Sequence, residues 1–171
     1  VEIKVLISLL REELKSRMLE KLYENQTRFR VLGRWRTIIS DQKLAHLIND
    51  LENRTRLFDK YSLTILLGYD GKRELVETIQ KNLNTWTRLS QAPDFEIIRG
   101  ALWTGELPPV DLVIRSGETK DCWAHWSSGF MMLHTADSEF YFSKTLWPDF
   151  SEQELRKILN EYGKRERKLG R

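Results

Sequence analysis

The sequence predicts an α/β fold in which an open, mainly parallel sheet is flanked by helices. The first observation is that short strand-like apolar runs alternate with segments of helical periodicity along the whole chain. Since parallel strands need a crossover, which a helix commonly supplies, this alternation indicates parallel pairing. The second observation is that residues 63–67 and 111–114 show little alternation of apolar and polar side chains, which is typical of strands covered on both faces.

The first half of the chain is expected to hold two helices and two strands. Apolar residues recur every three or four positions up to Tyr23, which predicts an amphipathic helix over residues 1–23. The branched and aromatic run at 28–33, closed by a glycine, predicts a strand. Helical periodicity returns at 40–58, with Ser40 as the expected N-cap. Residues 61–71 predict a second and largely buried strand.

The second half is expected to alternate in the same way. The predicted elements are a helix at 72–86 with the spacing of Leu75, Ile79 and Leu83, one or two helical turns at 94–102, a strand at 110–117, a strand at about 140–143 and a helix at 152–168. Ser151 and Glu154 match a capping box at the start of the last helix. No internal repeat or linker is visible, so the 171 residues are expected to form one domain.

Composition excludes several classes of protein. The 28 Lys and Arg residues are balanced by 25 Asp and Glu residues and are interspersed with them, which argues against a dedicated nucleic-acid binder. A single cysteine, Cys122, can form neither an intrachain disulfide nor a cysteine-based zinc site, and it fits a reducing compartment. No apolar run approaches the 18 or so residues of a membrane-spanning helix. We therefore expect a cytoplasmic protein.

Three loops at the carboxyl ends of predicted strands combine glycine with arginine or lysine. They are residues 33–36, 68–73 and 115–117. Ligands of open parallel sheets bind at this edge, and backbone amides beside a cation favour an anion such as phosphate. The alternative for each loop taken singly is an ordinary strand-to-helix turn.

Arg115 and Glu139 are the most informative charged residues. Arg115 directly follows an apolar strand, so its guanidinium must either reach a bound anion or pair with a carboxylate. Glu139 precedes a predicted strand and is either a ligand of Mg²⁺ beside a bound diphosphate or a charge that faces solvent. The spacing of His125, His134 and Cys122 fits no familiar zinc site.

Several motifs resemble those of the cis-prenyltransferases, the undecaprenyl diphosphate synthase family. The resemblance rests on "GELPPVDLVIRSG" at 105–117 and on "SSGFMMLHTADSEFYFSKTLWPDF" at 127–150, followed by "KRERKLG" at 164–170. The family's typical strand and loop reads P-V-D-L-[VL]-I-R-T-G-G-E. "TRFRVLG" at 27–33 and "LTILLGYDGKRELVETI" at 63–79 resemble two further family segments. The likeness covers nearly the whole chain.

The resemblance implies an activity and its partners. Enzymes of this family add isopentenyl diphosphate in cis to an allylic prenyl diphosphate, with the help of Mg²⁺, and make polyprenyl products of the undecaprenyl type. It also implies a homodimer, and a cytoplasmic protein that meets the membrane surface through its product. No contact with nucleic acid is implied.

The resemblance also assigns site residues. Arg115 matches the first arginine of the family's R-x-G motif, which holds isopentenyl diphosphate, and Ser128 matches the serine of its R-x-S element. Glu139 matches the glutamate associated with Mg²⁺. Alignment back from Ser128 places His125 where the family often has His or Lys. Trp126 stands where a second arginine is usual, so Lys120 is a candidate for the missing cation.

One departure from the family pattern, a missing loop, determines our prediction of whether the chain is active by itself. The family's D-G-N-x-R-W loop supplies the aspartate needed to ionise the allylic diphosphate, and it has no counterpart here. No catalytic residue is therefore assigned. We expect an amino-terminally truncated domain that lacks the first two strands of the fold and is inactive by itself. The alternatives are a noncatalytic subunit of a heteromeric cis-prenyltransferase, or a relative that makes a short or branched prenyl product.

Overall fold

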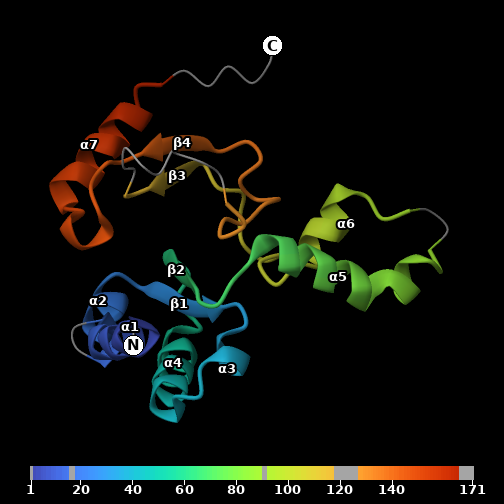
Figure 1. The fold of residues 1–171 in the computed structure, drawn as a ribbon, viewed down its shortest axis with the longest axis horizontal. Helices are drawn as coiled ribbons and strands as arrows, with labels where there is room; N and C mark the ends of the chain where they lie inside the picture. Colours follow the sequence, from blue (N-terminus) through green and yellow to red (C-terminus); the bar gives the residue numbers. More distant parts are fainter. Residues whose placement is uncertain (1, 16–17, 90–91, 118–126, 166–171) are drawn as a thin grey trace. The chain divides into compact units, whose positions relative to one another are not determined.

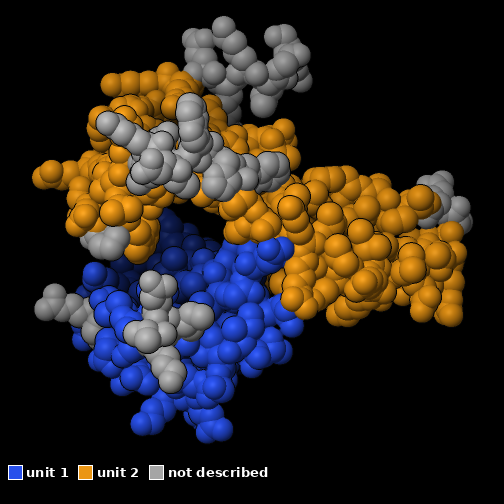
Figure 2. Space-filling view, in the orientation of Figure 1, with its two compact units in different colours: residues 1–70 blue, residues 71–171 orange. Residues whose placement is uncertain are grey.

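The computed structural model describes residues 2–15, 18–89, 92–117 and 127–165. They divide into two compact units, Val1–Asp70 and Gly71–Arg171 (Figure 2), and each unit is described by itself. The first unit contains α1 (Glu2–Lys15), α2 (Met18–Glu24), β1 (Thr27–Leu32), α3 (Trp35–Ile38), α4 (Gln42–Thr55) and β2 (Tyr61–Leu66). The second contains α5 (Gly71–Trp86), α6 (Phe95–Gly100), β3 (Leu112–Arg115), β4 (Glu139–Phe142), a 3₁₀ turn at Trp147–Asp149 and α7 (Glu152–Tyr162).

The first unit is built on a parallel pair of strands with a helical crossover. β1 and β2 run parallel in a register that places Phe29 beside Leu63, and α3 and α4 connect them. α4 packs against β1, and α1 and α2 complete the helical layer (Figure 1). The core is almost wholly apolar, with the fully buried residues Leu14, Leu22, Phe29, Val31, Trp35, Leu44, Ile48 and Leu51.

Side chains of α4 accept hydrogen bonds from backbone N–H groups on the edge of β1 that does not face β2. The Phe29 N–H donates to Thr55 Oγ1 at 3.0 Å, and the Val31 N–H donates to Glu52 Oε1 at 2.8 Å. The Thr55 hydroxyl in turn donates to the Leu51 carbonyl at 2.8 Å, and Thr55 is completely buried. Because buried backbone donors need a partner, these two side chains take the place that a neighbouring strand would fill.

The second unit contains the other parallel pair. β3 and β4 align Leu112 with Glu139 and Arg115 with Phe142. Residues 116–138 connect them, and the described part of this connection, 127–138, is formed by turns. α7 is attached to the end of β4, where the buried hydroxyl of Ser143 donates to the Glu154 carboxylate (Figure 1). The predicted α/β class and parallel pairing are therefore confirmed, as two parallel pairs flanked by helices.

Helix boundaries follow the predicted caps at some positions and not at others. Ser151 accepts from the Glu154 N–H at 3.2 Å, as predicted, but the Glu154 carboxylate bonds Ser143 instead of closing a capping box. The prediction of Ser40 as the N-cap of α4 was wrong, because the Asp41 carboxylate accepts from the Leu44 N–H. α7 ends at Tyr162, directly before Gly163, and so is shorter than the predicted helix.

One prediction of burial was wrong, and the burial of a second element, α5, was not predicted. β2 is not covered on both faces, since Tyr61 is 56% exposed and Leu63 is 37% exposed. In α5 the buried positions include Glu74 and Thr78, whereas the apolar side chains of Val76, Ile79 and Leu83 are exposed. The reason in α5 is that the Glu74 carboxylate binds the backbone of another segment of the same unit, and this bond turns that face of the helix inward.

Thr55 offers a test of how α4 holds β1. Thr55→Val keeps the side-chain shape but leaves the Phe29 N–H without a partner, so the free energy of unfolding should fall by about 1–3 kcal/mol. Thr55→Ser keeps the hydroxyl and should lose less than half as much. Denaturant titration followed by circular dichroism measures both. A loss in Thr55→Ser with no loss in Thr55→Val would show that the methyl group matters and the hydrogen bond does not.

Candidate functional site

Backbone hydrogen bonds fix Arg115 at the carboxyl end of β3. The Arg115 carbonyl accepts from the Ser143 N–H at 2.8 Å, so this residue still belongs to the paired strands. Two residues later the Gly117 N–H donates to the Thr145 carbonyl at 2.9 Å. Gly117 has a φ of +85°, a conformation that favours glycine, and the chain turns away there. The structure thus confirms that a strand ends at Arg115.

The Arg115 guanidinium lies against an aromatic ring. Its Cζ is 5.9 Å from the ring centroid of Phe130, a distance at which a cation is attracted to the ring face. Phe130 in turn meets Phe140 of β4 edge to face, with 6.3 Å between the centroids. Ring packing on β4 therefore positions Phe130, and Phe130 limits where the guanidinium can point. We did not predict a role for Phe130 from the sequence, although it follows the Ser127-Ser128-Gly129 segment used in the alignment.

Ser128 lies in a segment that packs tightly on the first residue of α5. The Gly71 N–H donates to the Ser128 carbonyl at 2.6 Å. A Cβ atom at Gly71 would lie 2.6 Å from the Phe130 carbonyl oxygen, closer than real Cβ contacts, so only glycine fits here. The second unit thus brings together the start of α5, residues 128–130 and, through the Phe130 ring, Arg115.

Glu139 lies at the opposite end of the same strand pair. It begins β4 and is aligned with Leu112, three residues before Arg115, which corresponds to a separation of about 10 Å along the strand. Its Oε2 atom is 2.7 Å from Nη1 of Arg165, so the carboxylate is engaged in an ion pair. The structure therefore does not bring Glu139 to Arg115.

The residues described in the structure give incomplete support for Mg²⁺ at this site. Carboxylate oxygen is the right ligand type for Mg²⁺, which usually takes one or two carboxylates together with phosphate oxygens. Among these residues, however, no group of three or more His, Cys, Asp or Glu side chains is arranged to hold a metal ion. Glu139 is turned to Arg165 and is remote from Arg115. His125 and Lys120, the further candidates for binding the diphosphate, lie outside the described residues, as does Cys122.

A buried polar cluster in the second unit was not predicted from the sequence. Oε1 of Glu74 accepts from both the backbone N–H and the hydroxyl of Thr104, at 2.8 and 2.9 Å. His134, which is 2% exposed, has no hydrogen-bond partner on either ring nitrogen among the described residues. Burial lowers the pKa of His134; the Glu74 carboxylate opposes this shift and the Arg99 guanidinium adds to it. The four-residue spacing of Glu74 and Thr78 was the available signal, but polar spacing does not show which face is buried.

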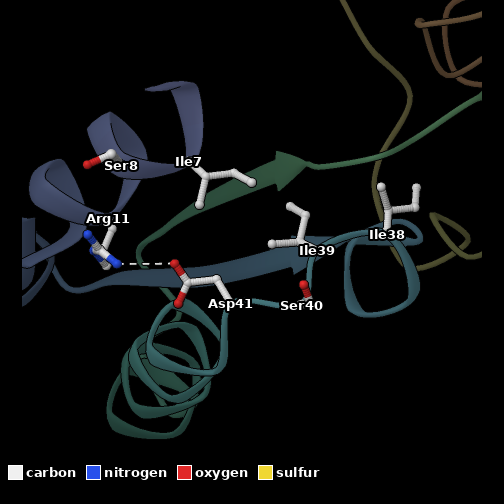
Figure 3. Close-up of a pocket in the computed structure, with 7 residues that line it drawn as sticks. All are labelled: Ile7, Ser8, Arg11, Ile38, Ile39, Ser40 and Asp41. Carbon is white, nitrogen blue, oxygen red and sulfur yellow. Dashed lines mark hydrogen bonds and ion pairs between the residues drawn. The ribbon is translucent and has the colours of Figure 1, made fainter. Parts of the chain in front are cut away.

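An apolar pocket of about 370 Å³ lies in the first unit, with the pocket of Figure 3 beside it. Its lining residues are Leu6, Ile7, Leu10, Ile38, Ile39, Ile65, Leu67 and Gly68. The second pocket, of about 290 Å³, shares Ile7, Ile38 and Ile39 and adds Ser8, Arg11, Ser40 and Asp41. Figure 3 shows Arg11 and Asp41 facing each other at one side of this group, and their Nη1 and Oδ2 atoms are 3.1 Å apart. The first unit therefore offers an aliphatic surface next to one charged pair.

The pKa of His134 predicts a dependence of stability on pH. Because the folded state keeps this imidazole neutral, the unfolded chain binds more protons below the ordinary histidine pKa of about 6.5. Stability should be fully present above that pH and should fall as the pH drops, by up to about 1.4 kcal/mol per pH unit. Urea titrations between pH 7.5 and 5 measure this slope.

His134→Gln should flatten the slope, while the same change at exposed His46 should leave it unaltered. A slope that is the same in wild type and His134→Gln would show that other groups cause the acid sensitivity.

Comparison with known proteins supports the same family as the sequence motifs. The sequence model of the family described as "Putative undecaprenyl diphosphate synthase" matches residues 1–170. A tritrans,polycis-undecaprenyl-diphosphate synthase (geranylgeranyl-diphosphate specific) of Pyrobaculum aerophilum is 32% identical over 173 residues, which cover 100% of this chain and 70% of the relative. An isoprenyl transferase of Rickettsia typhi is 33% identical over 170 residues, which cover 99% of this chain and 70% of the relative.

Solved structures agree with the fold. A probable undecaprenyl diphosphate synthase from Campylobacter jejuni is 25% identical, with a TM-score of 0.77 over 99% of this chain and 76% of that one. Lavandulyl diphosphate synthase from Lavandula x intermedia, solved with dimethylallyl diphosphate, is 24% identical, with a TM-score of 0.84 over 99% of this chain and 72% of that one. The chain therefore belongs to the undecaprenyl diphosphate synthase family of prenyltransferases.

Proposed function

We propose that this chain belongs to a cis-prenyl diphosphate synthase, an enzyme that condenses isopentenyl diphosphate with an allylic prenyl diphosphate. The observation that carries the proposal is the position of Arg115. A guanidinium fixed at the carboxyl end of a parallel strand, beside a glycine turn, lies where open α/β sheets bind anions. The family supplies the class of reaction.

Arg115 would bind the isopentenyl diphosphate. A planar guanidinium can donate two parallel hydrogen bonds to phosphate oxygens, which gives both affinity and orientation. The pairing of β3 with β4 and the Phe130 ring hold Arg115 before the ligand arrives, so little freedom is lost on binding. The hydroxyl of Ser128 is proposed as a second donor to the same diphosphate.

The apolar pocket of the first unit would hold the isoprenoid chain. Its lining is aliphatic, and burial of a hydrocarbon chain there is favourable because both surfaces leave water. The Pyrobaculum relative is named as specific for geranylgeranyl diphosphate, which is an allylic prenyl diphosphate. We therefore propose a substrate of this class and a polyprenyl product.

Mg²⁺ is proposed as the cofactor on the strength of the family resemblance. When bound to a diphosphate, it would neutralise charge on the leaving group. Glu139 is the proposed carboxylate ligand, and it would have to leave Arg165 to serve. Because Glu139 and Arg115 lie at opposite ends of the strand pair, we derive no step of the reaction through the metal.

A homodimer with peripheral contact to the membrane is also proposed. Leu146 and Trp147, in the segment after β4, are 56% and 75% exposed. Exposed apolar side chains of this size favour burial in an interface. Among the described helices, none is both long enough and apolar enough to cross a membrane.

The second candidate is a noncatalytic subunit of a heteromeric cis-prenyltransferase. One observation favours it, namely that Arg165 holds the Glu139 carboxylate that would otherwise serve a metal. Such a subunit would still bind isopentenyl diphosphate through Arg115. Incorporation of isopentenyl diphosphate by the purified chain without a second protein would argue against this candidate.

Replacement of Arg115 tests the proposal. Arg115→Ala should lower the affinity of the chain for isopentenyl diphosphate by about 100-fold, and it should lower incorporation of the radiolabelled form equally in an enzyme completed with the family's D-G-N-x-R-W loop. Arg115→Lys keeps the charge without the two-pronged geometry and should lose about tenfold. Titration calorimetry and product extraction measure the two effects.

Arg156→Ala is the matched control, because Arg156 is exposed and pairs with Glu152 on α7. Wild-type affinity in a folded Arg115→Ala protein would remove Arg115 from the diphosphate site.

A further inference from the structure

The two pockets of the first unit form one surface that changes from aliphatic to charged. They share Ile7 of α1, Ile38 of α3 and Ile39. The residues that only the larger pocket contains are all apolar, and those that only the smaller one contains are all polar. In Figure 3 Ile38 lies at one side of the group and the Arg11–Asp41 pair at the other, with Ile7 and Ile39 between them. The surface is therefore apolar at the Ile38 end and charged at the end formed by the Arg11–Asp41 pair.

Helical spacing on α1 produces this change. Ile7 and Arg11 are four residues apart and so lie on the same face of the helix, one turn from each other. Leu6 and Leu10, also four residues apart, form the neighbouring row in the apolar pocket. A hydrocarbon chain that follows the Ile7 row therefore meets the guanidinium of Arg11 after about 6 Å, the rise of one helical turn.

The partner of Arg11 is fixed from a different element. Oδ1 of Asp41 accepts from the Leu44 N–H at 3.0 Å and caps α4, while Oδ2 faces Arg11. This hydrogen bond and the charge of Arg11 lower the pKa of Asp41, so it stays a carboxylate. The side chains of Arg11 and Asp41 are 27% and 24% exposed, so most of their surface is shielded from water. The pair thus links α1 to the start of α4.

We propose that the Arg11–Asp41 pair is the stop that limits how long an isoprenoid chain the apolar pocket accepts. This inference rests on the proposed function, because it takes the pocket to hold the prenyl chain. A methylene group gains affinity only where it replaces water on an apolar surface, and removing water from a charged pair is unfavourable. Affinity should therefore rise with chain length until the chain reaches the pair, and then stop rising.

A series of saturated n-alkyl diphosphates, from about five to about twenty carbons, tests the stop without any catalytic turnover. Titration calorimetry on the full chain gives the affinity for each length. For wild type, affinity should rise roughly fourfold per buried methylene and then become constant beyond one length. In the double variant Arg11→Met with Asp41→Asn, the rise should continue for at least three more carbons, a gain of about 50-fold at the longest lengths.

The variants are chosen to leave the fold intact. Asn is as good an N-cap as Asp and keeps an oxygen for the Leu44 N–H, and Met keeps the length of the arginine stem. Arg11→Leu with Asp41→Ser also removes both charges and keeps an N-cap oxygen, and it carries the same prediction should Arg11→Met with Asp41→Asn fail to fold. Arg11→Lys keeps the cation and should keep the wild-type limit. The control is Arg54→Met with Asp50→Asn, which removes an exposed pair on α4 and should change nothing.

The outcomes separate this inference from the proposed function. Absence of binding by wild type at every length would contradict the proposed function itself. Binding with the same limiting length in wild type and in a folded variant that lacks both charges would contradict the stop and leave the proposed function standing. A wild-type affinity that rises through the longest chain would also overturn the stop.

Discussion

Parallel strand pairing is the constraint on which the rest of the structure depends. Strands that run in the same direction cannot be joined by a hairpin, so each pair needs a long connection that returns the chain to its starting edge. Between β1 and β2 this connection is α3 and α4, which supply half of the buried residues of the first core and place Asp41 beside α1. Between β3 and β4 it is the 116–138 segment, which places Phe130 beside Arg115 and Ser128 against the first residue of α5.

Partly or fully buried charges are handled differently at each place where they occur. Glu74 is almost fully buried and is satisfied by the backbone and hydroxyl of Thr104. Arg11 faces a carboxylate that also caps a helix. Arg115 lies near an aromatic face, which attracts a cation without neutralising it. The aromatic contact of Arg115 thus distinguishes the proposed anion site from the contacts described for Glu74 and Arg11.

The sequence predicted features that depend on local pattern and left out those that depend on distant partners. The parallel pairing, the end of β3 at Arg115 and the cap at Ser151 follow from apolar runs and capping residues, and the structure confirms them. The ion pair of Glu139 with Arg165 joins positions 26 residues apart, and no local pattern encodes it. The exposed apolar face of α5 was missed because periodicity gives the face of a helix but not its partner. Roles for Ser128, His125 and Lys120 stay predictions.

The central claim is that a strand end directs Arg115 to a diphosphate. A crystal structure of the chain with isopentenyl diphosphate tests it most directly. The account predicts diphosphate oxygens at about 2.7–3.2 Å from the Arg115 guanidinium nitrogens, with the Phe130 ring still beside the side chain. A diphosphate bound elsewhere, with Arg115 paired to a carboxylate of the chain, would contradict it.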